Sequence, residues 1–291
     1  MHYLSIRRLA PILALSVLLP SCGAPKNDKS GGHVSNETKI EQIEEQVQLD
    51  PAPILPQETE PEKTPSDVWD VSDVDVSSID PTRKLIAFTF DDAPSRTMEN
   101  IFAVYANFND NNPDCIASAT VFFNGNLFDA QTKHHLHVAC ALGFELGNHT
   151  HTHADLTTLT AEQITDEIRR TDEILEEADG KTYHLLRTPF GKTNETVKQC
   201  AFTPLIDWTI DTLDWTGVSA DEIYESVFSK RFSGAIVLMH DGYENTVDAL
   251  KRLLPALKED GYQVVSVSQL SKLHNCPLKR GNVYIRARKR R

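Results

Sequence analysis

Ionisable side chains stand where a series of short apolar runs end. Asp91 and Asp92 follow the letters AFTF, and His240 follows IVLM. Arg187 and Asp214 have similar places after two other runs. Parallel barrels put the carboxyl ends of their strands, and with them the active site, at one mouth. We therefore expect these side chains to converge.

The adjacent carboxylates of Asp91 and Asp92 can serve two different roles. Neighbouring residues at a strand end point in different directions, so one can bind a metal ion while the other moves a proton. On its own, the pair is equally compatible with a solvated acidic turn before a helix, because Pro94-Ser95 is typical of a helix start.

The stretch NHTHTHADL predicts a metal site. His149 and His153 are four residues apart, so a helical turn would put both imidazoles on one face and point His151 away. An extended chain would put all three on one face, but Gly147-Asn148 is typical of a turn, so we prefer the helical pairing.

A second histidine group, at positions 134, 135 and 137, lies in an expected polar helix without a nearby acidic residue. We interpret these three residues as exposed and not as site candidates.

The elements that must position the site lie between residues 81 and 278, where β-branched and aromatic runs alternate with helical stretches. This alternation is typical of an α/β fold with a parallel sheet or barrel. Seven strands are expected, at 84–90, 119–124, 143–147, 184–188, 205–210, 235–240 and 263–267. Helices are expected over 97–108, 131–142, 160–178 and 245–259. The third follows a Thr160-x-x-Gln163 capping box.

The N-terminus predicts export. The apolar run 9–19 follows Arg7 and Arg8 and is too short to span a bilayer, but it fits a signal peptide. At its end the segment Leu19-Pro20-Ser21-Cys22-Gly23 resembles a bacterial lipobox. We expect residues 1–22 to be a lipoprotein-type signal peptide, with Cys22 as the lipid attachment site. The alternative is an ordinary cleaved signal peptide.

Charge and composition indicate which partners are excluded and what the two terminal segments are. The 291 residues carry a net charge of −13, so nucleic acid is excluded as a partner by repulsion of its phosphates. Residues 23–80 are acidic and proline-rich, which predicts a disordered, flexible linker before the 81–278 domain. Residues 279–291 contain seven Lys or Arg and no acid, which predicts a solvated basic tail.

Four further cysteines, Cys115, Cys140, Cys200 and Cys276, leave two possibilities open. An exported protein could join them in two disulfides by any of three connectivities, or keep them as free buried thiols. None has zinc-finger spacing.

Five segments, in order, resemble the motifs of the polysaccharide deacetylase family, also called the NodB homology domain or carbohydrate esterase family 4. They are TFDDAP (89–94), HTHTH (149–153), RTPFG (187–191), DTLDW (211–215) and LMH (238–240). The match covers most of residues 84 to 268. The resemblance implies a distorted (β/α)7 barrel that binds one divalent metal ion, usually Zn²⁺ with Co²⁺ as another possibility. It also implies hydrolysis of N-acetyl groups on amino-sugar polymers, or of O-acetyl groups in xylan-active members.

Carried over by position, the resemblance makes Asp91 the catalytic base and His240 the catalytic acid. Arg187 would steady the base, and Asp214 would support its acid or base partner. The implied metal ligands are Asp92, His149 and His153.

The same resemblance implies that Phe190, Trp215 and Leu238 form the substrate pocket. Phe190 replaces a usual tyrosine, whose backbone N–H the family uses for the oxyanion. Ala93 replaces a usual glycine and Thr188 a usual proline. We expect these departures to alter substrate choice more than chemistry.

Together these observations predict a membrane-anchored lipoprotein of the bacterial cell envelope that removes N-acetyl groups from peptidoglycan or chitin-like chains. We expect an acetylated glycan as substrate, the membrane as partner through the lipid, and a monomer. One alternative is an O-acetyl esterase on xylan or an exopolysaccharide. The other is a non-catalytic glycan-binding lipoprotein, which would need neither Asp91 nor His240.

Overall fold

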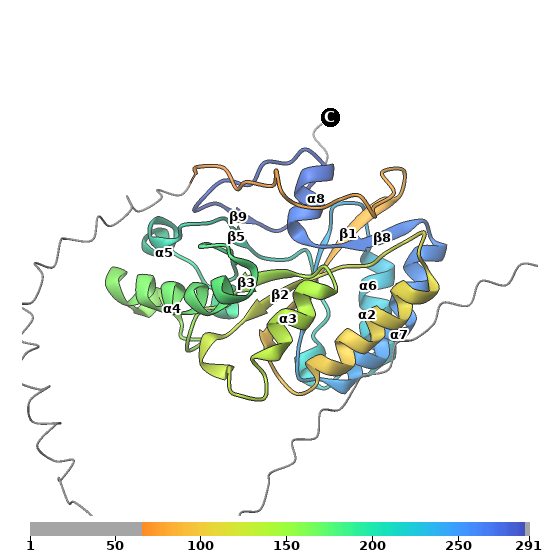
Figure 1. Cartoon of the computed structure of the whole chain (residues 1–291), viewed down its shortest axis with the longest axis horizontal. Coiled ribbons are helices and arrows are strands. Elements are labelled where there is room, and N and C mark those ends of the chain that lie inside the picture. Colours follow the sequence, from red (N-terminus) through yellow and green to blue (C-terminus); the bar gives the residue numbers. More distant parts are fainter. Residues whose placement is uncertain (1–65, 289–291) are drawn as a thin grey trace, which may run out of the picture. The chain divides into compact units, whose positions relative to one another are not determined.

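The apolar runs form a single curved sheet in the computed structural model, which describes residues 66–288 (Figure 1). The sheet has nine strands in the order β6-β7-β1-β2-β3-β4-β5-β9, with β8 paired to β1, and the pairings between these strands are parallel. The strands are β1 Lys84–Ala93, β2 Thr120–Phe123, β3 Glu145–Asn148, β4 Leu185–Leu186, β5 Leu205–Ile206, β6 Ile210–Asp211, β7 Ile236–His240, β8 Tyr262–Val265 and β9 Val283–Tyr284. This architecture confirms the expected distorted barrel.

Helices cover the outside of the sheet. They are α2 Met98–Asn111, α3 His134–Ala141, α4 Ala161–Asp179, α5 Glu195–Cys200, α6 Ala220–Lys230, α7 Glu244–Glu259 and α8 Val267–Leu273. Four of them confirm the expected helices, and the capping box of Thr160 and Gln163 starts α4 as predicted. Helices α5, α6 and α8 were not predicted from the sequence. Both α6 and α8 begin with capping boxes, Ser219 with Glu222 and Ser266 with Gln269.

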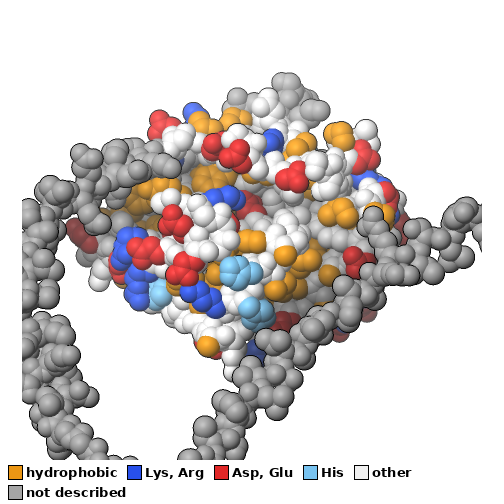
Figure 2. Space-filling view, in the orientation of Figure 1, with side chains coloured by type: hydrophobic (Ala, Val, Ile, Leu, Met, Phe, Trp, Pro, Cys, Tyr) orange, Lys and Arg blue, Asp and Glu red, His pale blue; other side chains and the backbone are white. Residues whose placement is uncertain are grey.

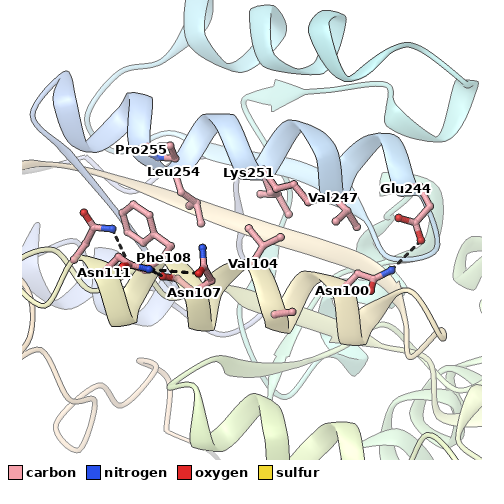
Figure 3. A pocket seen from close by; sticks show the side chains of 13 residues that line it. Asn100, Val104, Asn107, Phe108, Asn111, Glu244, Val247, Lys251, Leu254 and Pro255 are labelled. Atoms are coloured by element: carbon pink, nitrogen blue, oxygen red, sulfur yellow. Dashed lines mark hydrogen bonds between the residues drawn. The ribbon is translucent and has the colours of Figure 1, made fainter.

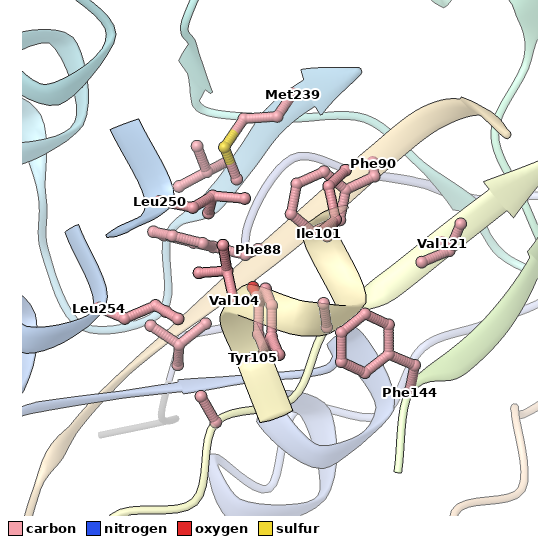
Figure 4. Packing of buried hydrophobic residues seen from close by; sticks show 14 of the residues in the cluster. Phe88, Phe90, Ile101, Val104, Tyr105, Val121, Phe144, Met239, Leu250 and Leu254 are labelled. Carbon is pink, nitrogen blue, oxygen red and sulfur yellow. The ribbon is translucent and has the colours of Figure 1, made fainter. Parts of the chain in front are cut away.

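Strand β1 divides the core and carries the first site residues. Ile86, Phe88 and Phe90 face outward into the cluster beneath α2 and α7, where Phe90 meets Tyr105 edge to face (Figure 4). The alternate residues Leu85 and Ala87 belong to the inner cluster with Phe122 and Ile206. Because side chains alternate along a strand, Thr89 and Asp91 continue this inner row. The pleat of β1 therefore points Asp91 into the barrel.

The expected strand 205–210 is instead two short strands. β5 pairs with β4 and β9, whereas β6 pairs with β7 at the other end of the sheet. Residues 207–209 cross the opening between them. The carbonyls of Ile206 and Asp207 accept hydrogen bonds from Arg187 at 2.8 and 3.2 Å, so this segment helps to satisfy a buried guanidinium. The backbone N–H groups of Asp207 and Thr209 donate to the carbonyls of Tyr284 in β9 and Ile236 in β7.

The folded domain is longer than expected at both ends. Residues 66–80, predicted as linker, pack on the domain: the Trp69 indole N–H donates to Ser268 Oγ at 2.8 Å and Ile79 is buried. In the predicted basic tail, β9 joins the sheet beside β5 and Ala287 is buried. A few apolar residues spaced among charged ones suffice for this packing, which composition averages conceal.

Some predictions concern residues that the structure does not describe, and the cysteine alternatives concern residues that it does describe. The signal peptide, Cys22 and most of the linker lie outside the described residues. The four cysteines from Cys115 onward are free thiols. No helix within residues 66–288 is long and apolar enough to span a membrane.

Candidate active site

The five motif segments meet at the carboxyl ends of the strands. Asp91 lies at the end of β1, directly beside His240 at the end of β7, because the two residues are partners in the β1–β7 register. His149 follows β3, and Arg187 follows β4. Parallel pairing thus brings together residues that are far apart in the sequence.

Asp91 is held by a buried arginine. Arg187 is fully buried, and its Nη1 donates to Asp91 Oδ1 and to Thr89 Oγ1, each at 2.7 Å. Burial raises the pKa of the Asp91 carboxyl, but the positive charge of Arg187, aided by its hydrogen bond and by His240, outweighs burial and lowers the pKa overall. Asp91 is therefore ionised at neutral pH and can accept a proton.

Asp92, His149 and His153 form a group that fits a metal ion. Their ligand atoms all lie within 4.8 Å of one another. Asp92 Oδ1 is 3.7 Å from His149 Nε2 and 3.5 Å from His153 Nε2. His149 Nδ1 lies 2.8 Å from the carbonyl oxygen of Arg187, to which it donates, so Nε2 keeps its lone pair for a metal. Two imidazoles and a carboxylate are a donor set that zinc accepts.

The expected helical pairing of His149 and His153 is wrong. The residues after β3 form an irregular loop in which Thr150 and His153 have φ values of 68° and 58°. These left-handed residues fold the loop back, so the two imidazole centroids lie 4.9 Å apart without a helical turn. The Nδ1 of His151 lies against Gly125, so His151 takes no part in the group, as expected.

His240 is paired with a buried aspartate. Its Nδ1 lies 2.7 Å from Asp214 Oδ1, and its backbone N–H donates to Asp214 Oδ2 at 2.7 Å. Burial lowers the pKa of His240, but the hydrogen bond to Asp214 and the charge of Asp91 outweigh burial and raise the pKa above its usual value. The ring can therefore hold a proton near neutral pH.

Two supporting hydroxyl groups were not found from the sequence. Thr246, in the first turn of α7, donates its hydroxyl to Asp214 Oδ2 at 2.7 Å. Thr89 accepts from Arg187. Their buried positions depend on packing between distant elements. Thr89 opens the TFDDAP segment, although no role was predicted for it, whereas no sequence signal distinguishes Thr246 from other threonines.

The expected pocket residues have different exposures. Leu238 is buried in β7, whereas Phe190 and Trp215 are 62% and 53% exposed. Phe190 has a φ of 60°, and its ring packs edge to face against His153, with centroids 4.7 Å apart. Leu213 is also exposed, with a φ of 58°, and was not predicted.

A groove of about 540 Å³ lies elsewhere, between α2 and α7 (Figure 3). None of its lining residues belongs to the five motif segments. It is distinct from the candidate active site.

Comparisons with known proteins agree with this arrangement. Residues 78–203 match the family model described as polysaccharide deacetylase. A bifunctional xylanase/deacetylase of Pseudobutyrivibrio xylanivorans is 33% identical over 191 residues, which are 65% of this chain and 30% of that protein. The peptidoglycan-N-acetylmuramic acid deacetylase PdaC of Bacillus subtilis is 29% identical over 196 residues, 67% of this chain and 40% of PdaC. The chain thus spans less than half the length of these curated relatives.

Among solved structures, one described as "T48 deacetylase with substrate" superposes with a TM-score of 0.64. It is 31% identical in sequence, and the match covers 71% of this chain and 99% of that one.

Proposed function

Because this chain belongs to the polysaccharide deacetylase family, we propose that it hydrolyses N-acetyl groups on amino-sugar poly- or oligosaccharides such as peptidoglycan or chitin-like chains. One observation carries the proposal. The three potential metal ligands, Asp92 and two histidines, lie beside an ionised Asp91 and a His240 that can be protonated. Binding a glycan requires neither of the last two, which argues against a purely glycan-binding protein.

Asp92, His149 and His153 would hold the divalent ion, and we propose zinc because two imidazoles and one carboxylate are typical zinc ligands. When bound, the ion lowers the pKa of a water molecule and polarises the acetyl carbonyl.

Asp91 would accept the proton of the attacking water as the water oxygen bonds to the acetyl carbon. Arg187 keeps the carboxylate ionised and fixes one of its oxygens, so Oδ2 remains to take the proton. Oδ2 lies 3.7 Å from His149 Nε2, which places the base next to the proposed metal ligands.

His240 would donate its proton to the departing amine as the C–N bond breaks. Its partner Asp214 keeps the imidazole charged and fixes its orientation through Nδ1, so Nε2 carries the proton to be donated. The backbone N–H of Phe190 is proposed to stabilise the oxyanion, a contribution of about 3 kcal/mol for such donors.

The test separates the two adjacent aspartates. Asp92→Ala should lose the metal, and activity with it. Asp91→Asn should keep the metal while the turnover number falls by about 10²-fold or more. Metal content by elemental analysis and the deacetylation rate are measured for both variants. A reversed pattern would exchange the two roles, and full activity in both would place the site elsewhere.

Asp91→Asn needs a stability control. The substitution leaves the buried Arg187 opposite a neutral amide. Removing one partner of a buried ion pair lowers the free energy of unfolding by roughly 3 kcal/mol. Rates are therefore compared at a temperature where unfolding curves show the variant to be folded.

A second candidate is removal of O-acetyl groups from xylan. It is favoured by a relative from Cellvibrio japonicus described as a bifunctional xylanase/xylan deacetylase. Asp91 and His240 would have the same roles whether the leaving atom of the substrate is the nitrogen of an amide or the oxygen of an ester. Mass spectrometry of acetylated chitooligosaccharides, peptidoglycan and acetylxylan after incubation would identify which substrate loses acetyl groups.

We also propose that the protein acts in the bacterial cell envelope, as a monomer held to the membrane by lipid on Cys22. The support is the apolar run before Cys22 and the peptidoglycan deacetylases among the relatives. Cys22→Ala should move the protein from a membrane fraction that requires detergent to a soluble exported form. Unchanged membrane attachment would refute the anchor.

A further inference from the structure

A second group of potential metal ligands lies between the first turns of α2 and α3. It consists of Glu99 from α2 with His134 and His135 from α3, and its ligand atoms lie within 4.8 Å of one another. It shares no residue with the candidate active site. Figure 2 shows histidine side chains exposed on the face that carries α3.

His135 is not the exposed residue that the sequence suggested. It is 1% exposed and packs edge to face against Phe102, with ring centroids 5.8 Å apart. Neither of its ring nitrogens has a hydrogen-bond partner within the described part of the chain. Leaving a buried polar group unsatisfied destabilises the folded state, so this imidazole is suited to a ligand that the protein chain does not supply.

The spacing of the three side chains fits an ion better than it fits hydrogen bonds. Glu99 Oε1 is 3.6 Å from Nε2 of His134 and 3.6 Å from Nε2 of His135. A hydrogen bond would bring these atoms to about 2.7–3.2 Å. Two ligands of a tetrahedral zinc ion with bonds of about 2.0–2.1 Å lie roughly 3.3 Å apart. Small side-chain movements would close this difference.

The three side chains also differ in how freely they can move. His135 is fixed by the core, whereas the side chains of Glu99 and His134 are 66% and 54% exposed. An ion can therefore enter from solvent and be enclosed by the two exposed side chains over one fixed ligand. The sequence concealed the group because its acidic member lies on another helix.

We propose that Glu99, His134 and His135 form a second divalent-metal site, of zinc-binding type, that joins the start of α2 to the start of α3. Two imidazoles and one carboxylate suit Zn²⁺ better than Mg²⁺ or Ca²⁺, which prefer oxygen ligands. Because the ion binds residues from both helices only when they are folded together, it should stabilise the native state.

The first experiment counts zinc on the untagged full chain by elemental analysis after dialysis against buffered Zn²⁺. Wild type should hold two equivalents, and Asp92→Ala should hold one. Glu99→Gln and His134→Gln change exposed side chains, so folding should be preserved, and each should lose one equivalent or bind it at least tenfold more weakly.

The matched control is His137→Gln, an exposed histidine of the same helix outside the group. It should keep both equivalents. Loss of zinc in this control to the same extent as in His134→Gln would overturn the assignment, as would a second equivalent that persists in Glu99→Gln.

A thermal shift supplies the second readout, in the Asp92→Ala background where the other site is lost. Added Zn²⁺ should raise Tm in this background, and the rise should disappear when Glu99→Gln is added. A chain that binds no zinc in the Asp92→Ala background would refute the second site while leaving the proposed deacetylase activity untouched.

Discussion

Asp214 controls the protonation of His240, so its removal should change how activity depends on pH. The pKa of His240 is raised by this carboxylate, so the imidazole stays protonated to a higher pH and activity is lost only as pH rises through that value. Asp214→Asn should lower the pKa, shift the alkaline limb of the kcat profile to lower pH and reduce kcat by about 10²-fold. The measurement is kcat against pH.

The matched control is Asp211→Asn in the same motif. The Asp211 carboxylate accepts from the backbone N–H of Leu213 at 2.9 Å and is not among the groups that shift the pKa of His240. Its alkaline limb should remain in place. An equal shift in both variants would indicate a general effect of charge and not the Asp214–His240 pair.

For single residues, the sequence indicated which side chains belong to the site, but it did not indicate the backbone conformation that positions them. Asp91, Asp92 and His149 were recognisable because ionisable residues after apolar runs are unusual. The loop that carries His153 was not, because left-handed backbone at a histidine has no sequence signal. The contact between Glu99 and His135 was also hidden, since it depends on how two helices pack.

Among the elements, α4 is joined to β4 by a buried charged group. His184 Nδ1 lies 2.9 Å from Asp172 Oδ1, and its Nε2 lies 3.2 Å from Asp179 Oδ1. Burial lowers the pKa of His184, but the two carboxylates outweigh burial and raise the pKa to about 9. Asp172 also accepts from Asn148, the last residue of β3 before His149.

This group predicts a pH-dependent stability. Because the folded-state pKa of His184 lies above its unfolded value of about 6.5, its contribution is fully present below pH 6.5 and is lost as pH rises towards about 9. Urea unfolding should show wild-type stability falling across that window. His184→Gln should be less stable at the acidic end and should lose less stability across the window than wild type does. A level wild-type curve would contradict the prediction.

The elements themselves were predictable where local signals were strong. The capping box and periodic apolar residues identified α4, and the same capping boxes could have identified α6 and α8. The division of 205–210 into β5 and β6 could not be predicted, because it depends on which distant strands each short strand pairs with.

For the whole molecule, the boundary of the folded domain is the feature to test. A chain that begins at residue 66 should be as stable as the full chain, because the described contacts of the domain remain. A chain that begins at residue 81 should be clearly less stable, since it loses the Trp69 hydrogen bond and the burial of Ile79. Trp69→Ala alone should cost about 2 kcal/mol. Thermal unfolding measures all three.

Equal stability of the chains beginning at 66 and 81 would restore the boundary that composition suggested. Composition failed here because it averages over a window, whereas packing depends on single apolar residues. The barrel was predictable because its strands are rich in apolar residues. The two ends of the domain were not predictable, because they contain few such residues.

The left-handed residues around the mouth have a consequence for protein engineering. Asp92, His153, Phe190 and Leu213 all have φ values between 58° and 62° without being glycine, and each such residue costs roughly 1–2 kcal/mol. Glycine at position 190 would relieve this cost but also remove the ring beside His153. Thermostability and turnover therefore compete at these positions, so a campaign that selects variants for heat resistance alone would be expected to erode catalysis at the mouth first.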